Sequence, residues 1–291
     1  MKYCHKSGLK INLSLKVVGK RPDNFHLLES IFVPIVDIYD EIALDIAPSD
    51  KLIINFTSNI SSVNGFDGNN NLAVKAAELY CRKSGITAKI LLYLRKYIPI
   101  GGGVGGGSGN AACVLKILNE KYNRFNNEQL KELALQLGAD VPFFIDNKLA
   151  QVSGIGEVVK LFESAMDLYF VLIFPCFPVS TVWAFKNLPE ELKKVDDLKR
   201  TESVVAGLKA GDVELVYNNL HNDFEEILFK KYPLYQVIAE SLNSRKLSIS
   251  GSGSTAFILC KSENEQNVIY DRLEALLRGE NLIFKKAVYR R

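Results

Sequence analysis

Histidine is scarce in this sequence, and its cysteines show no paired spacing. Only three of the 291 residues are histidine, which argues against a metal centre built from several histidines. The five cysteines contain no CxxC pair and are widely scattered, at Cys4, Cys81, Cys113, Cys176 and Cys260. Because disulfide frameworks and zinc sites need closer or even sets, we expect free, buried thiols.

Long hydrophobic runs and an excess of one charge are also missing. The longest apolar run, residues 168–177, is about half of what a membrane-spanning helix needs. The polar N-terminus has no apolar secretory region. The 36 basic residues nearly balance the 33 acidic ones, and a net charge of +3 is too small for a protein that lives on nucleic acid. We therefore expect a soluble cytoplasmic protein with no nucleic acid or membrane partner; the sequence carries no signal for an oligomeric state.

The composition that is present belongs to an ordinary globular protein. Hydrophobic residues make up 47% and charged residues 24%, which excludes disorder and fibrous repeats. A length of 291 residues predicts about two domains. Helix and strand patterns alternate along the chain, so we predict an α+β fold with two lobes and a boundary near residue 155.

The N-terminal segment predicts a strand with two polar side chains on one face. Apolar and polar residues alternate over residues 10–17, so Lys10 and Asn12 share a face. Residues 57–70 read as a loop and residues 189–202 as a solvated surface element. Further predicted strands cover 38–46, 51–56, 88–94, 149–153, 157–161, 168–174, 247–249 and 256–260. Predicted helices run from a cap at Asn70 or Asn71 through Lys83, and over 127–137, 212–218, 232–242 and 265–277.

Six glycines within residues 101–107 run directly into an amphipathic helix pattern. Ordered glycines cost backbone entropy, so such a run is kept where the backbone must approach something closely or adopt a positive φ. A helix N-terminus offers free N–H groups and the positive end of a dipole. We therefore interpret the run as a phosphate-binding loop. A flexible linker or tight turn is the less favoured alternative.

Other nucleotide-binding motifs fit this loop poorly. A Walker loop needs GxxxxGK[ST], and no lysine follows the second glycine. The glycines formally match GxGxxG, but Pro99 interrupts the approaching strand and Glu120, the acid about 20 residues on, lies on the predicted helix itself. The HRD and DFG motifs of protein kinases are absent.

Three sequence blocks resemble the GHMP kinases, the small-molecule kinases of galactose, homoserine, mevalonate and their relatives. The loop PIGGGVGGGSGNAA resembles their phosphate loop, and LKINLSLKVVGKRPDNFH and ISGSGSTAF resemble two further blocks. The N-terminal block resembles the branch that phosphorylates the 2-hydroxyl group of a cytidine diphosphate-linked methylerythritol, 4-diphosphocytidyl-2-C-methyl-D-erythritol, in the non-mevalonate isoprenoid pathway. GADVPFF, VSGIGE and HNDFE match the same branch.

The resemblance covers essentially the whole chain. It implies a two-lobed GHMP kinase fold, with an N-terminal nucleotide-binding lobe over 1–155, a C-terminal lobe over 156–291, and the active site in the cleft between them. It also implies ATP and Mg²⁺ as cofactors. The sequence departs from the pattern at three positions: Gly109 replaces the usual Ser or Thr, Phe25 the common Tyr, and Leu9 the usual alanine.

The resemblance implies two catalytic residues. Asp140 would face the acceptor hydroxyl as general base, although from the residues alone it reads as the N-cap of the next helix. Lys10 would lie beside Asp140, orient its carboxylate and neutralise developing charge. Without the resemblance, Lys10 reads as a solvated strand lysine. Asn12 would point into the same cleft.

The nucleotide-binding residues implied by the resemblance surround the glycine run. They are Lys96, Pro99, Gly101, Gly102, Gly103, Gly105, Gly106, Gly107, Ser108 and Asn110. The Ser108 hydroxyl could contact a phosphate oxygen or Mg²⁺, or serve only as an N-cap. Asn110 could cap the helix or touch ATP, and Lys96 could instead be an exposed strand-end lysine.

The implied substrate-binding residues are Asn12, Phe25, His26, Phe185, Gly251 and Gly253. Phe25 and Phe185 would sandwich the cytosine, and a neutral His26 would accept a hydrogen bond from its amino group. Phe185 could instead be a core residue. Gly251 and Gly253 would form a turn against the active site, or a plain hairpin.

Two alternative functions remain open at this point. A homoserine- or mevalonate-type kinase would give no reason for the PDxxH sequence within the N-terminal block. A non-catalytic nucleotide-binding protein on this fold would give no reason to keep both Lys10 and Asp140.

Overall fold

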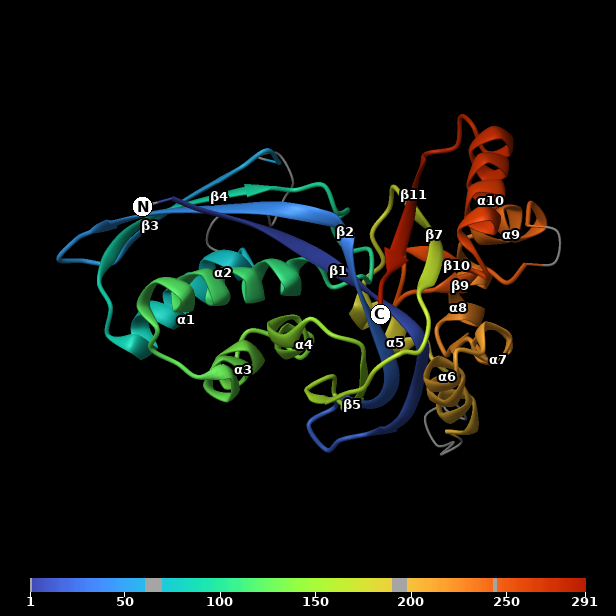
Figure 1. The fold of residues 1–291 in the computed structure, drawn as a ribbon, viewed down its shortest axis with the longest axis horizontal. Helices are drawn as coiled ribbons and strands as arrows, with labels where there is room; N and C mark the ends of the chain where they lie inside the picture. Colours follow the sequence, from blue (N-terminus) through green and yellow to red (C-terminus); the bar gives the residue numbers. More distant parts are fainter. Residues whose placement is uncertain (1, 61–69, 190–197, 243–244) are drawn as a thin grey trace. The chain divides into compact units, whose positions relative to one another are not determined.

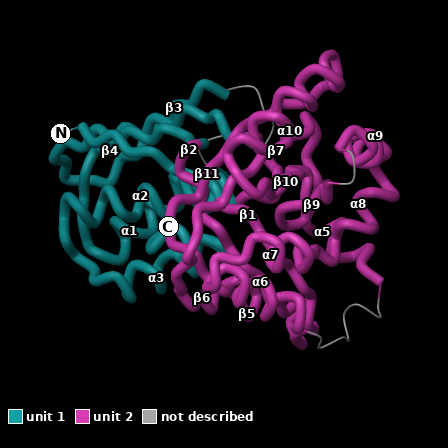
Figure 2. Tube along the Cα trace, turned by 45° about the vertical axis from the view of Figure 1, so that its right-hand side comes forward, with its two compact units in different colours: residues 1–9, 38–98, 105–147 teal, residues 10–37, 99–104, 148–291 magenta. Residues whose placement is uncertain are grey.

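The computed structural model describes residues 2–60, 70–189, 198–242 and 245–291. They form two compact units (Figure 2): unit 1 contains residues 1–9, 38–98 and 105–147, and unit 2 contains 10–37, 99–104 and 148–291. Neither unit is a continuous segment, because strands β1 (Lys2–Lys20) and β2 (His26–Pro48) contribute residues to both. The predicted α+β class is confirmed, whereas the single boundary near residue 155 stays a prediction.

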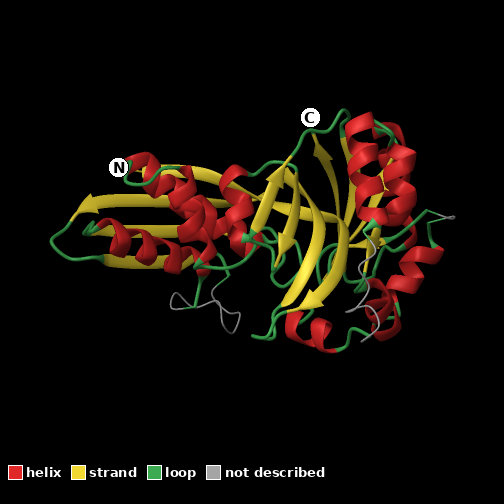
Figure 3. Ribbon diagram, turned by 90° about the horizontal axis from the view of Figure 1, so that it is seen from below, coloured by secondary structure: helices red, strands yellow, loops and turns green. Residues whose placement is uncertain are grey.

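Unit 1 packs helices on a sheet (Figures 1 and 3). Strand β4 (Ala88–Arg95) pairs in parallel with β3 (Ile53–Ser58) and antiparallel with residues 41–48 of β2. Helix α1 (Leu72–Ser84) packs against β3 and against α2 (Gly106–Tyr122). Two shorter helices follow α2, namely α3 (Asn127–Leu135) and α4 (Val141–Asp146).

The ends of α1 are set by local sequence, as predicted. The Asn71 side chain accepts a hydrogen bond of 2.9 Å from the backbone N–H of Ala73, which satisfies a donor that the helix itself leaves free. Gly85 ends the helix with a left-handed φ of 70°, and its N–H donates to the Cys81 carbonyl.

Unit 2 contains a four-stranded sheet in the order β11-β7-β10-β9. Helix α10 packs against β7 and β11. Away from this sheet, β1 pairs in parallel with β8, and β2 pairs with β5, which pairs with β6. The strands are β5 (Ala150–Gly154), β6 (Val158–Leu161), β7 (Leu168–Pro175), β8 (His221–Asn222), β9 (Ser248–Ile249), β10 (Ala256–Cys260) and β11 (Leu282–Tyr289). The helices are α5 (Thr181–Lys186), α6 (Lys199–Ala210), α7 (Val213–Asn219), α8 (Glu225–Lys231), α9 (Leu234–Glu240) and α10 (Glu263–Leu276).

Most predicted elements are confirmed within a few residues, but several were not foreseen. The N-terminal part of β2, the helices α5 and α8, and strands β8 and β11 had no prediction, whereas α4 is the helix expected directly after Asp140. The segment expected to be a solvated element, 189–202, lies largely outside the described residues, and α6 begins within it at Lys199. Part of the predicted loop 57–70 also lies outside them. In the described part of the chain, no helix is long and apolar enough to cross a membrane.

The cysteines are free, as expected, but not all of them are buried. Cys81, Cys113 and Cys260 are buried, whereas Cys4 and Cys176 are exposed. The expectation of buried thiols is therefore wrong for those two positions. Cys4 lies near the start of β1 and Cys176 directly follows β7, where the chain leaves the sheet.

Candidate active site

The glycine run forms a loop that leads directly into helix α2, as predicted. Gly101, Gly103 and Gly105 adopt left-handed φ values of 74°, 73° and 69°, which only glycine adopts without strain. Gly105 occupies the N-cap position of α2, and no side chain caps this helix end. The first N–H groups of α2 therefore keep their capacity to bind an anion such as a phosphate.

In unit 2, the loop segment 99–104 lies directly on the turn between β9 and β10. A Cβ atom on Gly103 would come within 2.5 Å of the Ser250 carbonyl oxygen and 2.6 Å of the Gly253 carbonyl oxygen. The backbone N–H of Thr255 donates to the Gly102 carbonyl at 3.0 Å. This approach explains the need for glycine at position 103. Gly251, with a φ of 57°, belongs to the same turn, and a Cβ atom on it would come within 2.6 Å of the Gly103 carbonyl oxygen. The turn thus packs on the glycine loop, while the role of Gly251 and Gly253 in substrate binding stays a prediction.

Lys10 and Asn12 lie on one face of β1, as predicted, and contact each other. Lys10 Nζ donates to Asn12 Oδ1 at 2.6 Å and lies 4.4 Å from the centre of the Phe32 ring. The Asn12 amide donates to Ser30 Oγ at 2.9 Å. Lys10 is only 3% exposed, so the alternative of a solvated strand lysine is wrong.

Lys96 is also buried, which corrects the alternative of an exposed strand-end lysine. Its Nζ forms an ion pair and hydrogen bond with Asp40, and Asp40 Oδ1 accepts from the backbone N–H groups of Tyr97 and Ile98 at 2.8 Å each. Burial lowers the pKa of Lys96, while Asp40 acts in the opposite direction. A Cβ atom on Gly106 would lie 3.1 Å from Lys96 Nζ, so this ammonium lies next to the first residue of α2.

Ser108 and Asn110 lie inside helix α2 rather than at its cap. Because Gly105 is the N-cap, the capping role considered for both residues is wrong. Asn110 is 2% exposed, and its Oδ1 has no hydrogen-bond partner among the described residues. A buried acceptor of this kind is costly without a partner, so it is suited to a ligand that donates or to a cation.

Gly109 is fixed by its neighbours in unit 1. A Cβ atom there would lie 2.8 Å from the Gly8 carbonyl oxygen and 3.0 Å from Ser7 Oγ. The departure from the usual Ser or Thr thus coincides with a close approach of β1 to α2 at this position.

Asp140 occupies the N-cap position of α4, but its side chain makes no capping hydrogen bond. The helix therefore does not need this carboxylate for capping, and the interpretation of Asp140 as only an N-cap residue loses its main support. Lys10 belongs to unit 2 and Asp140 to unit 1. Their pairing stays a prediction.

Two of the predicted base-binding residues stack on each other, and the cytosine sandwich between Phe25 and Phe185 stays a prediction. The rings of His26 and Phe185 stack with centroids 4.6 Å apart and planes at 17°. Phe185 also contacts Phe224 edge to face at 4.9 Å, so it borders the core of unit 2. Phe25 is 57% exposed.

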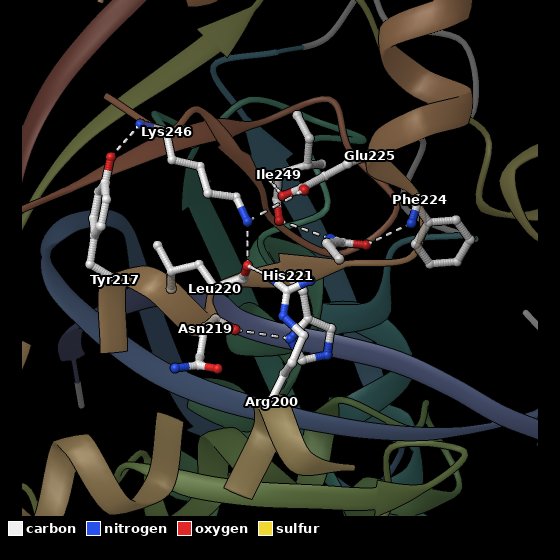
Figure 4. Close-up of polar contacts among 10 residues, drawn as sticks. Arg200, Tyr217, Asn219, Leu220, His221, Phe224, Glu225, Lys246 and Ile249 are labelled. Atoms are coloured by element: carbon white, nitrogen blue, oxygen red, sulfur yellow. Dashed lines mark hydrogen bonds and ion pairs between the residues drawn. The ribbon is translucent and has the colours of Figure 1, made fainter. Parts of the chain in front are cut away.

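Several residues that shape the site were not singled out from the sequence. Asp40 gave no signal, because its partner Lys96 lies 56 residues away. Ser250, Thr255 and Asn222 lay inside the blocks ISGSGSTAF and HNDFE, but nothing in those blocks distinguished them as structural. Figure 4 shows the polar contacts around the second block, where Glu225 and Lys246 lie beside Ile249.

Comparison with known proteins places these features in a family. Residues 71–148 match the GHMP kinases N terminal domain and residues 204–279 match the GHMP kinases C terminal domain. A 4-diphosphocytidyl-2-C-methyl-D-erythritol kinase of Alkaliphilus metalliredigens is 33% identical over 96% of this chain and 94% of its own length. The kinase of the same name from Prosthecochloris aestuarii is 35% identical over 94% of both chains.

Solved structures agree with this placement. The crystal structure of a 4-(cytidine 5'-diphospho)-2C-methyl-D-erythritol kinase matches with a TM-score of 0.78 and 28% identity, over 98% of this chain and 99% of that one. A homoserine kinase from Cytophaga hutchinsonii matches with a TM-score of 0.79 over 99% of this chain and 94% of that one, but at 19% identity. The second likeness shows a shared fold alone.

Proposed function

This chain belongs to the 4-diphosphocytidyl-2-C-methyl-D-erythritol kinases of the GHMP family, and on that premise we propose its reaction: transfer of the γ-phosphoryl group of ATP to the 2-hydroxyl group of 4-diphosphocytidyl-2-C-methyl-D-erythritol. The product enters the non-mevalonate isoprenoid pathway. The structural observation that best supports this function is the buried Lys10–Asn12 pair. Asn12 contacts Ser250, in the turn between β9 and β10 of unit 2, and the glycine-loop residue Gly103 contacts the same serine.

Phosphoryl transfer requires alignment, neutralisation of charge and an acceptor for the alcohol proton. We assign the first two tasks, alignment and neutralisation of charge, jointly to Lys10 and to the glycine loop with the N–H groups of α2. We assign the third to Asp140, whose carboxylate is not used to cap α4. Lys96, held by Asp40 next to Gly106, adds a fixed positive charge beside the amino end of α2.

The residues at the start of α2 fit a magnesium ion that is held largely by nucleotide phosphates. Mg²⁺ in kinases is bound through one or two protein oxygens together with substrate phosphates and waters. Ser108 Oγ, in the first turn of α2, and Asn110 Oδ1, which has no hydrogen-bond partner among the described residues, would be protein oxygens for such a role. When bound, the ion would neutralise charge on the transferring group. The cytoplasmic location expected from the sequence remains a prediction.

A homoserine- or mevalonate-type kinase is the alternative within the fold. The match to homoserine kinase at 19% identity supports only the architecture. His26, the last residue of the PDNFH sequence, stacks on the ring of Phe185. Neither homoserine nor mevalonate contains a base for which such a ring pair would be needed.

The deciding experiment measures ADP formation from ATP and Mg²⁺ with 4-diphosphocytidyl-2-C-methyl-D-erythritol, homoserine or mevalonate as acceptor. We expect turnover with the cytidyl substrate and none above the acceptor-free background with the other two. Turnover with homoserine or mevalonate alone would assign the alternative kinase. Nucleotide binding without turnover of any acceptor would indicate a non-catalytic protein.

A further inference from the structure

The side chain of Asn222 holds the turn between β9 and β10 on both sides of Ser250. Its Nδ2 donates to the carbonyl oxygens of Ile249 and Gly251, at 2.8 Å each. Its Oδ1 accepts from the Phe224 backbone N–H at 2.9 Å. Asn222 is 6% exposed, so all these bonds are formed away from solvent. One buried amide thus holds the carbonyl groups of the two residues on either side of Ser250.

Ser250 in turn touches both functional parts of unit 2. Its hydroxyl lies 3.3 Å from Asn12 Oδ1, the same oxygen that accepts from Lys10 Nζ. The hydroxyl also lies 3.4 Å from the carbonyl oxygen of Gly103 in the glycine loop. The position of Ser250 is therefore coupled to the catalytic lysine on one side and to the phosphate loop on the other.

Asn222 is well placed to set that position, because its own strand is anchored to β1. Strand β8 pairs in parallel with β1, with Asn222 opposite Leu15. The next residue, Asp223, accepts from the Val17 N–H at 2.8 Å and lies 3.6 Å from Lys16 Nζ. Asn222 therefore joins the strand that carries Lys10 to the turn that supports Gly103.

The neighbouring residues reinforce the same turn. Glu225 Oε1 accepts from the Ile249 N–H at 3.2 Å, and Lys246 Nζ lies 4.0 Å from the Glu225 carboxylate (Figure 4). Lys246 Nζ also donates to the Leu220 carbonyl, just before β8. The Glu225 contact holds Ile249, whereas the Asn222 side chain hydrogen-bonds to both Ile249 and Gly251.

We propose that Asn222 is a positioning residue of the kinase reaction, which acts through Ser250 to align Lys10 and the glycine loop. The inference rests on the proposed function, because it concerns the same site. Displacing a catalytic group by about 1 Å can cost roughly 10²-fold in rate, so loss of this support should reduce turnover rather than substrate affinity.

The test compares Asn222→Asp with a matched control, Gln266→Glu. Gln266 is likewise a buried amide of unit 2, 2% exposed, whose Nε2 donates to two backbone carbonyls, those of Phe170 and Ala287. Each substitution replaces an NH₂ donor by an oxygen and buries a carboxyl group. Loss of stability is expected in both, whereas only Asn222 contacts the turn.

We expect kcat of Asn222→Asp to be at least about 10-fold below that of Gln266→Glu, with both KM values within about 3-fold of wild type. Ser250→Ala, a milder variant, should also lower kcat. In the Ser250→Ala background, Asn222→Asp should lower kcat by no more than about 2-fold, since the effects of substitutions at coupled residues are not additive. Equal kcat values for Asn222→Asp and Gln266→Glu, or full additivity in the double variant, would overturn the inference.

Hydrogen exchange decides the inference independently of activity. The Thr255 amide donates to the Gly102 carbonyl and so reports contact between turn and loop. We expect it to exchange at least about 10-fold faster in Asn222→Asp and Ser250→Ala than in Gln266→Glu. Unchanged exchange in both turn variants would overturn the positioning role. Absence of turnover in the wild-type enzyme would refute the proposed function alone.

Discussion

Lys10 Nζ donates a 2.6 Å hydrogen bond to Oδ1 of Asn12, two residues further along β1. Both side chains are almost completely buried, at 3% and 1% exposure. Burying an ammonium group costs free energy unless polar groups compensate it, and here the amide oxygen and the face of Phe32 contribute. The result is a positive charge held in one position, which suits a group that must meet developing negative charge.

We predict that Lys10→Ala and Asp140→Asn each lower kcat by at least about 10²-fold, while the affinity for ATP changes much less. Lys89→Ala, on the exposed face of β4, is the control and should leave kcat within about 2-fold. Steady-state kinetics with calorimetric nucleotide binding measures both quantities. Near wild-type turnover in either catalytic variant would remove that residue from the mechanism.

The cytosine base should be recognised by His26. A neutral imidazole nitrogen can accept from the amino group of cytosine, whereas uracil presents a carbonyl oxygen at the same place. Because sites built around a hydrogen bond strongly reject analogues without it, the uridine form should be a much poorer substrate. His26→Ala should narrow the difference in kcat/KM between the two forms.

Phe25→Leu provides the comparison for this prediction. Phe25 is 57% exposed, and loss of stacking should weaken binding of cytidine and uridine forms alike, by about 1–3 kcal/mol. The ratio of their kcat/KM values should then stay near that of wild type. Equal kcat/KM for both forms in the unsubstituted enzyme would remove His26 as the base-reading residue.

Gly109→Ala should destabilise the protein by about 1–3 kcal/mol, because its Cβ would meet backbone of β1 at Gly8 O, 2.8 Å away. Gly107→Ala in the same helix is the control, since its Cβ would meet only Leu72 Cδ1 at 3.8 Å. There the better helix propensity of alanine should stabilise by about 0.5–1 kcal/mol. Urea unfolding of both variants measures the difference, and equal stability of Gly109→Ala and wild type would contradict the close approach.

Stability should fall below neutral pH because of His221. Burial lowers its pKa from 6.5 to about 4, against the effect of its hydrogen bond to the Asn219 carbonyl. Between these values the unfolded chain binds a proton that the native state does not, so the free energy of unfolding decreases as pH falls from 6.5 towards 4. The loss can reach about 3 kcal/mol, at about 1.4 kcal/mol per pKa unit.

Two nearby carboxylates have the opposite effect on stability as the pH falls. Burial raises the pKa values of Asp223 and Glu225, so their protonation favours the native state as pH falls. Denaturant titrations of wild type and His221→Gln at pH 4 to 7 isolate the histidine, because both proteins share these carboxylates. We expect the stability advantage of wild type to shrink with acidification, and a difference that is constant with pH would contradict the prediction.

Local patterns predicted much of the fold because they depend only on neighbouring residues. The cap at Asn71 and the stop at Gly85 define α1 correctly. Strand β8 could not be predicted in this way, since two residues carry no period and only their pairing with Ser14 and Leu15 of β1 makes them a strand. The pairing of Lys96 with Asp40 was equally invisible, because a lysine at a strand end is solvated unless a distant part of the chain covers it.

The sequence by itself determined which chemical groups are present and which share a face. The alternation along residues 10–17 put Lys10 and Asn12 on one side of β1, and the glycine run fixed where α2 begins. Only the tertiary structure decided that Lys10 is buried and that Gly103 lies on Ser250, 147 residues away in the chain. The physical reason is that burial and close backbone approach are set by non-local packing, which no local sequence pattern encodes.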